Sequence, residues 1–258
     1  KADGEIRLAY SMIKSRNVPD ELKIKIKIRE KESGLIIKEF IVSDVDIVNP
    51  SFVLLKVSGH LLWNAWERGI ANLYVAKTEL FAQEKIFDSR EIVFGFRDIE
   101  IIRNREETTF VINGEKIFLR GTCYMPDIYI SKVSRNQYKR DIQNAKMLGF
   151  NAIRVHVHTA KNYFYELCDE YGMMVIQDSD FNWVHDISDD FAKRSTNIFS
   201  QVILHLQSHP SIIGWICMNE PDFVKNRVSV DSIVGRTLWE TACTYDPQRP
   251  AILASYLV

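Results

Sequence analysis

Residues 149–178, GFNAIRVHVHTAKNYFYELCDEYGMMVIQD, decide the class of fold. Apolar runs at 150–157 and 173–178 predict two strands, and the amphipathic stretch 161–171, closed by Gly172, predicts a helix between them. Strands that are almost wholly apolar are typical of parallel sheets covered on both faces. The stretch therefore predicts a βα unit of an α/β protein.

The same alternation of strand and helix continues on both sides of this stretch. A hairpin is expected at Asn113-Gly114, and Ser134 is a plausible cap for a helix that closes at Gly149. The remaining predicted segments are strands at 109–112, 116–123, 211–218 and 251–255 and helices at 191–207 and 229–243. Counted from residue 119 they supply about five parallel strands, whereas a closed (β/α)8 barrel needs eight and roughly 250 residues. A small open doubly wound sheet and the front part of a TIM barrel both fit this pattern.

The first hundred residues follow a β pattern instead. From Glu21 to Arg29 isoleucine and leucine alternate with lysine and arginine, which predicts a half-solvated antiparallel strand. Further short strands are expected at 5–13, 35–42, 52–58, 72–81 and 91–102. Their number and spacing indicate an immunoglobulin-like β-sandwich over residues 1–105, followed by the α/β domain over 106–258.

Composition excludes several classes of protein. The chain of 258 residues is 46% hydrophobic and 26% charged, as in globular proteins, and its net charge of -1 gives no electrostatic reason to expect nucleic acid or a membrane surface. No apolar run reaches the roughly 18 residues of a membrane helix. We also expect no cofactor. The cysteines, Cys123, Cys168, Cys217 and Cys243, fall on predicted apolar faces and are expected to serve packing.

The amino terminus carries neither an initiator Met nor an apolar leader segment, and we expect it to be a cut end. Unpaired cysteines without a signal peptide favour the cytoplasm. A trimmed secretory leader would give the same sequence, so a secreted or periplasmic location stays open.

Polar residues that interrupt an apolar strand mark candidate sites, because ligands of α/β folds bind at the carboxyl ends of parallel strands. In residues 215–221, WICMNEP, an apolar strand ends in Asn219 and Glu220. A carboxyl group at such a point is well placed as a proton donor. A helix cap or a surface carboxylate that begins the next loop would give the same pattern.

Arg154, His156 and His158 form the second candidate site. On a strand these three side chains share one face, so that they line one site together. The two histidines, with Asp178, could bind a metal ion. The alternative is a buried arginine paired to a carboxylate, with histidines that make hydrogen bonds at the strand end.

The third candidate follows the strand at 173–178. Asp178 and Asp180, with Phe181 and Trp183 nearby, could bind sugar hydroxyls and stack on an apolar sugar face, or could form a capped loop.

The motifs of this chain, taken in order, resemble glycoside hydrolase family 2. The matching stretches are Gly95-Phe96-Arg97, VINGEKIFLRG at 111–121, GFNAIR at 149–154, FYELCDEYG at 164–172, HPSIIGW at 209–215 with Asn219-Glu220, and DPQRP at 246–250. They are similar to that family's junction between sandwich and barrel, its second barrel unit and its acid/base signature. The resemblance implies a TIM barrel preceded by an immunoglobulin-like domain.

The resemblance also implies roles for single residues. Glu220 matches the general acid/base and Asn219 the residue that hydrogen-bonds the sugar 2-hydroxyl. Arg154 matches a structural or subsite residue near the nucleophile, and we expect His158, Asp178 and Trp183 to bind substrate as well. The resemblance implies chemistry of the β-galactosidase, β-mannosidase or β-glucuronidase type. The runs GTCYMPD at 121–127 and Ile176-Gln177-Asp178 favour the branch of the β-mannosidases and exo-glucosaminidases, whereas Asn219-Glu220-Pro221 is also common in β-glucuronidases.

One departure from the family concerns the nucleophile. Retaining glycosidases use two carboxyl groups about 5–5.5 Å apart, and the family's nucleophilic Glu ends the seventh strand. No residue of this sequence matches it. We therefore expect an internal fragment of a retaining exo-β-glycosidase that is inactive by itself.

Two alternative functions stay open, and the sequence also gives an expectation for the assembly state. A metal-dependent hydrolase would use His156, His158 and Asp178, whereas a non-catalytic module would bind carbohydrate without turnover. An incomplete barrel leaves an unpaired sheet edge at strand 251–255, so we expect a homodimer or marginal stability.

Overall fold

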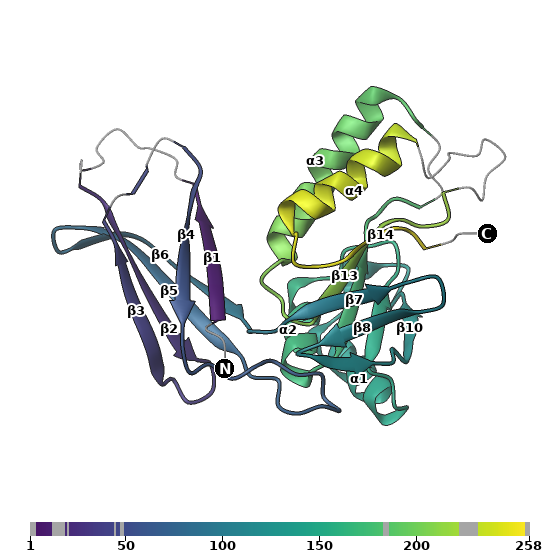
Figure 1. The fold of residues 1–258 in the computed structure, drawn as a ribbon, viewed down its shortest axis with the longest axis horizontal. Helices are drawn as coiled ribbons and strands as arrows, with labels where there is room; N and C mark the ends of the chain where they lie inside the picture. Colours follow the sequence, from purple (N-terminus) through teal and green to yellow (C-terminus); the bar gives the residue numbers. More distant parts are fainter. Residues whose placement is uncertain are drawn as a thin grey trace. The chain divides into compact units, whose positions relative to one another are not determined.

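The computed structural model describes residues 4–11, 19, 21–43, 45–46, 49–182, 186–221 and 232–255. The chain forms two compact units, one of Lys1–Trp63 with Asn72–Phe96 and the other of Asn64–Ala71 with Arg97–Val258. Each is described separately (Figure 1).

The first unit consists of two antiparallel sheets. One has the strand order β3-β2-β5-β6 and the other pairs β1 with β4. The strands are β1 (Gly4–Tyr10), β2 (Lys23–Glu30), β3 (Ile36–Val42), β4 (Ser51–Val57), β5 (Tyr74–Ala82) and β6 (Lys85–Phe94).

Strand β2 shows why these residues form a sandwich. Its isoleucines are buried, as the alternating pattern predicts, and they share a core with Leu55 and Val57 of the other sheet. On the opposite face Lys25 and Lys27 both pair with Glu39, at 3.5 and 3.1 Å. One face of β2 therefore packs in the apolar core, and the other carries charged side chains that pair with Glu39. That the sandwich is immunoglobulin-like stays a prediction.

The second unit begins with a three-stranded antiparallel sheet of β7 (Ile99–Arg103), β8 (Thr108–Ile112) and β9 (Glu115–Ile117). Ile112 pairs with Glu115 across Asn113 and Gly114, whose φ angles of 53° and 80° fit a tight type I′ turn. The hairpin predicted from Asn113-Gly114 is thus confirmed.

Two predicted strands are wrong in extent. The run 91–102 divides into the end of β6 and most of β7, which belong to different units, and 116–123 divides into parts of β9 and β10 (Gly121–Tyr124). The units separate after Phe96 rather than after residue 105. Arg97 explains why the boundary between the units falls there: its Nε and Nη2 donate to the carbonyls of Pro210 and Ile212 in the second unit, at 2.6 and 2.8 Å.

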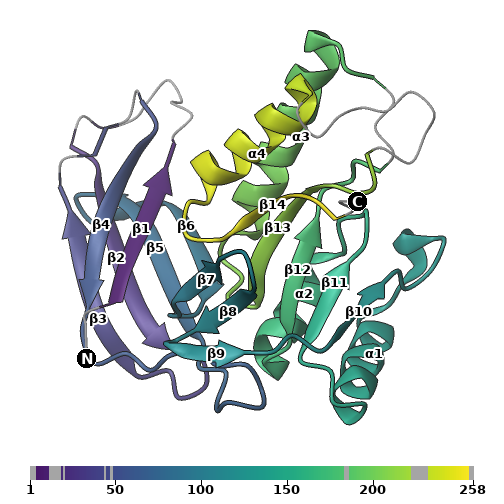
Figure 2. The same ribbon diagram turned by 45° about the vertical axis from the view of Figure 1, so that its right-hand side comes forward.

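A five-stranded parallel sheet forms the centre of the second unit (Figure 2). After β10 come β11 (Ala152–Val155), β12 (Met174–Asp178), β13 (Ile212–Met218) and β14 (Ala251–Ala254), with neighbours in chain order. A doubly wound sheet reverses its strand order, whereas a barrel does not. The sequential order agrees with part of a barrel and removes the doubly wound alternative.

The α-helices connect these strands. A 3-10 turn, η1 (Ile130–Lys132), precedes α1 (Arg135–Met147), and α2 (Asn162–Tyr171), α3 (Asp189–Leu206) and α4 (Ile233–Tyr245) follow, with α3 and α4 side by side in Figure 1. Ser134 caps α1 as predicted, since its hydroxyl accepts from Gln137 N at 3.2 Å. Ser232 caps α4, and the predicted start of this helix at 229 lies outside the described residues.

The register of the sheet separates its two faces. Ile153, Val175 and Trp215 pack with the helices in one core, while Arg154, Ile176 and Gly214 are aligned on the opposite face. In a barrel the second face is the interior. Polar side chains on that face therefore mark the place to look for a site.

The amino ends of the strands are closed by a buried polar network. His209 Nδ1 lies 2.6 Å from Asp169, and Arg249 bonds Asp246 and the carbonyls of Gln207, His209 and Ile212. Trp215 Nε1 also donates to Asp246, at 2.9 Å. The motifs HPS at 209–211 and DPQRP at 246–250 therefore have a structural role: their side chains form hydrogen bonds around the start of β13 and fix it in place.

The segment 64–71 belongs to the second unit and is held there by hydrogen bonds to residues far along the chain. Trp66 N donates to Gly172 O at 2.9 Å, Trp66 Nε1 donates to Phe150 O at 3.0 Å, and Asn151 Nδ2 donates to Glu67 at 2.7 Å. Gly172 has a φ of 65°, and a Cβ there would lie 2.7 Å from Trp66 N. Glycine is required at this position both by backbone conformation and by close approach.

Within the described ranges, no helix has the length and apolar character needed to cross a membrane. Among the same residues β14 pairs only with β13, and the homodimer expected from this edge stays a prediction.

The substitution Gly172→Ala tests the close approach. We expect it to lower the free energy of unfolding by more than about 2 kcal/mol, since left-handed strain and a clash with Trp66 N add together. Gly149→Ala is the matched control, because Gly149 has a φ of 79° and open space around its Cβ position. Equal losses in urea denaturation would show that the segment 64–71 does not press on Gly172.

Candidate active site

Arg154 and Asp178 form a two-pronged ion pair at the carboxyl ends of β11 and β12. Arg154 Nε and Nη2 donate to the two carboxylate oxygens of Asp178 at 2.9 and 2.7 Å. The Asp178 side chain is only 1% exposed, and Val157 N donates to it at 3.2 Å. Fork-to-fork geometry of this kind fixes both orientation and charge.

Asn219 joins this pair to the next strands. Its Oδ1 accepts from Arg154 Nη2 and from Ser255 Oγ, both at 2.7 Å, while its Nδ2 donates to Asn182 Oδ1 at 2.7 Å. Asn219 is 3% exposed. The ends of β11, β12 and β13 and the residue after β14 thus share one hydrogen-bonded network.

The charge of Arg154 is secured by its partner. Burial opposes the positive charge, but the hydrogen bonds and the negative charge of Asp178 outweigh it and raise the pKa of the guanidinium above its ordinary value. Arg154 Nη1 faces Cys123 Sγ at 3.9 Å. Cys123 is exposed, so its prediction as a packing residue is wrong, whereas Cys168 and Cys217 are buried as predicted.

Glu220 follows Asn219 directly and is half-buried, with Pro221 buried after it. Its φ is 44°, in the left-handed region that non-glycine residues seldom adopt. The backbone of β13 therefore turns sharply at the carboxylate. Such outliers concentrate at functional sites.

The predicted common face of Arg154, His156 and His158 is wrong. β11 ends at Val155, and Val157 has a φ of 48°, so the period of two residues breaks before His158. His156 Nδ1 still lies 3.5 Å from Asp178 Oδ2. His158 turns back instead: it is 6% exposed and its Nδ1 lies 2.9 Å from the His156 carbonyl.

No group of three potential metal ligands converges within the part of the chain that the structure describes. The proposed ligand set of His156, His158 and Asp178 is separated by the turn at Val157, and Asp178 is occupied by Arg154. The metal-dependent alternative has no support in this geometry.

Asp178, the last residue of β12, and Asp180 lie in two different environments. Asp178 belongs to the ion pair, whereas Asp180 accepts a hydrogen bond from Thr159 Oγ1 at 3.4 Å. Burial raises the pKa of Asp180 above its ordinary value, and the bond from Thr159 and the nearby His158 offset part of that shift. Trp183, expected to stack on a sugar, lies outside the described residues.

Sequence analysis did not single out Asn182, Ser255 or Tyr165. The first two bond Asn219, and Tyr165 OH donates to Gln177 Oε1 at 2.6 Å while accepting from Ala160 N at 3.0 Å. Asn182 and Ser255 follow strand ends, which is the signal that identified Glu220. Tyr165 lies within a helix and carries no such signal.

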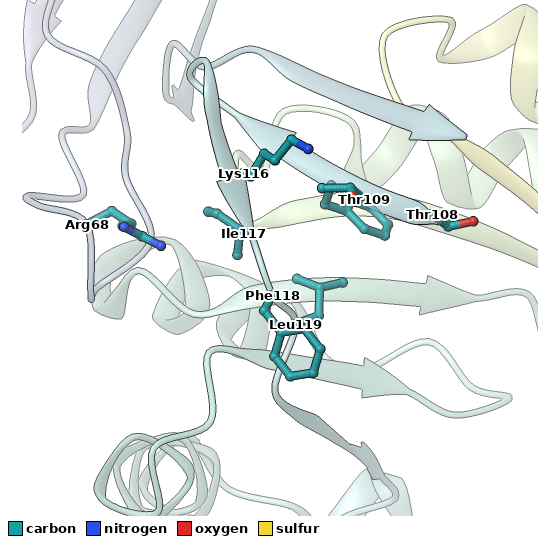
Figure 3. A pocket seen from close by; sticks show the side chains of 8 residues that line it. Arg68, Thr108, Thr109, Lys116, Ile117, Phe118 and Leu119 are labelled. Carbon is teal, nitrogen blue, oxygen red and sulfur yellow. The ribbon is translucent and has the colours of Figure 1, made fainter. Parts of the chain in front are cut away.

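A hollow of about 510 Å³ lies away from these residues, beside the hairpin of β8 and β9 (Figure 3). Its lining residues are Arg68, Thr108, Thr109, Phe110, Lys116, Ile117, Phe118 and Leu119. None of them is a carboxylate, and none is a predicted site residue. It therefore lacks the carboxyl groups that glycoside hydrolysis uses.

The fold and the site together define part of a barrel-type α/β domain with a carboxylate at the end of a parallel strand. Residues 103–254 match the model of the glycosyl hydrolases family 2 TIM barrel domain. This match covers more than half of the chain, and the chain belongs to glycoside hydrolase family 2.

Relatives within the family carry several activities in their names. The β-galactosidase of Staphylococcus xylosus is 28% identical over 187 residues, which cover 65% of this chain and 17% of that protein. The β-mannosidase of Capra hircus is 34% identical over 135 residues, covering 48% and 15%. The crystal structure of Parabacteroides merdae β-glucuronidase has a TM-score of 0.81 at 20% identity, covering 97% of this chain and 32% of that one, and is similar in fold. The chain thus spans a minor part of the length of these proteins.

The buried ion pair is tested by a double-mutant cycle. Arg154→Met leaves a buried carboxylate without its cation and is expected to cost about 3–5 kcal/mol in urea denaturation. Arg154→Met combined with Asp178→Asn should cost clearly less than the sum of the two single changes. Lys25→Met, which breaks an exposed pair with Glu39, is the control and should cost less than about 1 kcal/mol. Additive losses would contradict direct coupling.

Asp180 gives a pH-dependent prediction. Because its pKa is raised in the folded state, the folded protein binds this proton more tightly, and stability falls as pH rises through the shifted range. Asp180→Asn should therefore raise the melting temperature at pH 7 and leave it unchanged near pH 3. Asp186→Asn should do the opposite at pH 7, since hydrogen bonds from Ser188 lower the pKa of Asp186. The same sign for both variants would refute the assignment.

Proposed function

We propose that this chain is part of a retaining exo-β-glycosidase of β-mannosidase or β-galactosidase type, with Glu220 as its general acid/base. Family membership supports hydrolysis of O-glycosidic bonds. The observation that carries the proposal is the position of Glu220 at the sharp turn after β13, directly beside the network of Asn219, Arg154 and Asp178.

In this proposal Glu220 acts twice. It first protonates the glycosidic oxygen as the bond to the leaving group breaks, while a second carboxylate attacks the anomeric carbon. It then removes a proton from the water that hydrolyses the glycosyl-enzyme. Asn219, locked on three sides, keeps one Nδ2 hydrogen with which to donate to the sugar 2-hydroxyl.

Asp178 is unsuited to be the attacking carboxylate. Both of its oxygens accept hydrogen bonds from Arg154, and its side chain is almost wholly buried. We therefore assign Asp178 to holding Arg154 and Val157 in place. The attacking carboxylate is expected from another part of the protein, consistent with the small share of its relatives' length that this chain spans.

Glu220→Gln in the full-length protein tests the role of Glu220. Loss of the acid slows departure of poor leaving groups most, because good leaving groups depart without protonation. We expect kcat/KM to fall about 10²–10⁴-fold on alkyl glycosides or disaccharides and much less on dinitrophenyl glycosides.

Glu240→Gln is the matched control, since Glu240 lies on the exposed side of α4. It should leave both classes of substrate unaffected. Equal losses on good and poor leaving groups for Glu220→Gln would count against the acid/base role. Rescue of the variant by azide would support it, because azide attacks the glycosyl-enzyme in place of water and needs no general base.

A further inference from the structure

His156 has one covered and one open side. Its Nδ1 is buried without a hydrogen-bond partner and faces Asp178 Oδ2 at 3.5 Å. The side chain as a whole is 29% exposed. Because Nδ1 contributes none of that area, the exposed part of the ring is made by its other atoms.

The neighbouring carboxylate determines which nitrogen carries the proton. A negative Asp178 next to Nδ1 favours a hydrogen on that atom. The second nitrogen, Nε2, is then an acceptor in the neutral ring. No described contact uses Nε2, so its acceptor capacity is available to a ligand.

The other histidine of the motif cannot take this part. His158 is 6% exposed, its Nδ1 is held by the His156 carbonyl, and its Nε2 is buried. The turn at Val157 thus directs one histidine towards Asp178 and the other into the protein.

We propose that His156 is a substrate-binding residue whose Nε2 accepts a hydrogen bond from a hydroxyl of the sugar, a role that sequence analysis gave to His158. The inference rests on the proposed glycosidase function and adds a determinant of sugar specificity.

The test combines variants of the full-length protein with altered sugars. His156→Phe removes the acceptor and keeps a ring, while His156→Gln restores a polar group near the same place. kcat/KM is measured on the aryl β-glycoside that the wild type hydrolyses best and on analogues in which each sugar hydroxyl is removed in turn. His205→Phe, on the exposed end of α3, is the control.

We expect His156→Phe to lower kcat/KM on the parent sugar about ten-fold, the worth of one hydrogen bond, and His156→Gln to recover part of it. On the analogue that lacks the contacted hydroxyl, the wild type should already show that loss and His156→Phe should add less than two-fold. His205→Phe should match the wild type on every substrate.

An equal effect of His156→Phe on all analogues would indicate a structural role and overturn the inference, as would an unchanged kcat/KM. Either result leaves the proposed function intact, because that is judged by wild-type activity and by Glu220→Gln. A wild-type protein that hydrolyses no glycoside would overturn both.

Discussion

The Arg154–Asp178 pair is the constraint on which the carboxyl edge of the sheet depends. A carboxylate as buried as Asp178 is tolerated only when a cation and further donors satisfy it. Arg154, Val157 N and His156 surround it, and Arg154 also reaches Asn219. The strand ends are consequently placed by one charged contact and the hydrogen bonds that radiate from it, which is how a site gains rigidity before any ligand arrives.

The two ends of the parallel sheet differ in the polar contacts and in the backbone strain that they contain. At the amino end, Arg97 and Arg249 donate to backbone carbonyls at Pro210 and His209, Asp169 accepts from Ser211 N, and burial strongly lowers the pKa of Arg97. At the carboxyl end the backbone is strained at Val157 and Glu220. Backbone strain is thus concentrated at the carboxyl edge, where the candidate site lies, as expected where strain serves a site.

Most of the sheet and its Glu220 could be predicted from sequence, because apolar runs and the polar residues that end them are local signals. The strands at 91–102 and 116–123 could not be divided correctly, since partners distant in the chain decide where pairing stops. The sequence also could not show that His156, rather than His158, faces Asp178. This arrangement follows from a positive φ at Val157, and a β-branched residue gives no hint of that conformation.

The contacts of the segment 64–71 impose a delay during biosynthesis, because its partners are synthesised much later than the segment itself. Trp66 leaves the ribosome long before its partners Phe150 and Gly172, which are 84 and 106 residues further along. At typical rates of synthesis this delay is on the order of ten seconds. The first unit can complete its sheets within that time while the tryptophan waits uncovered. A nascent chain of this length therefore passes through an interval in which a large aromatic side chain is open to chaperones or to other chains.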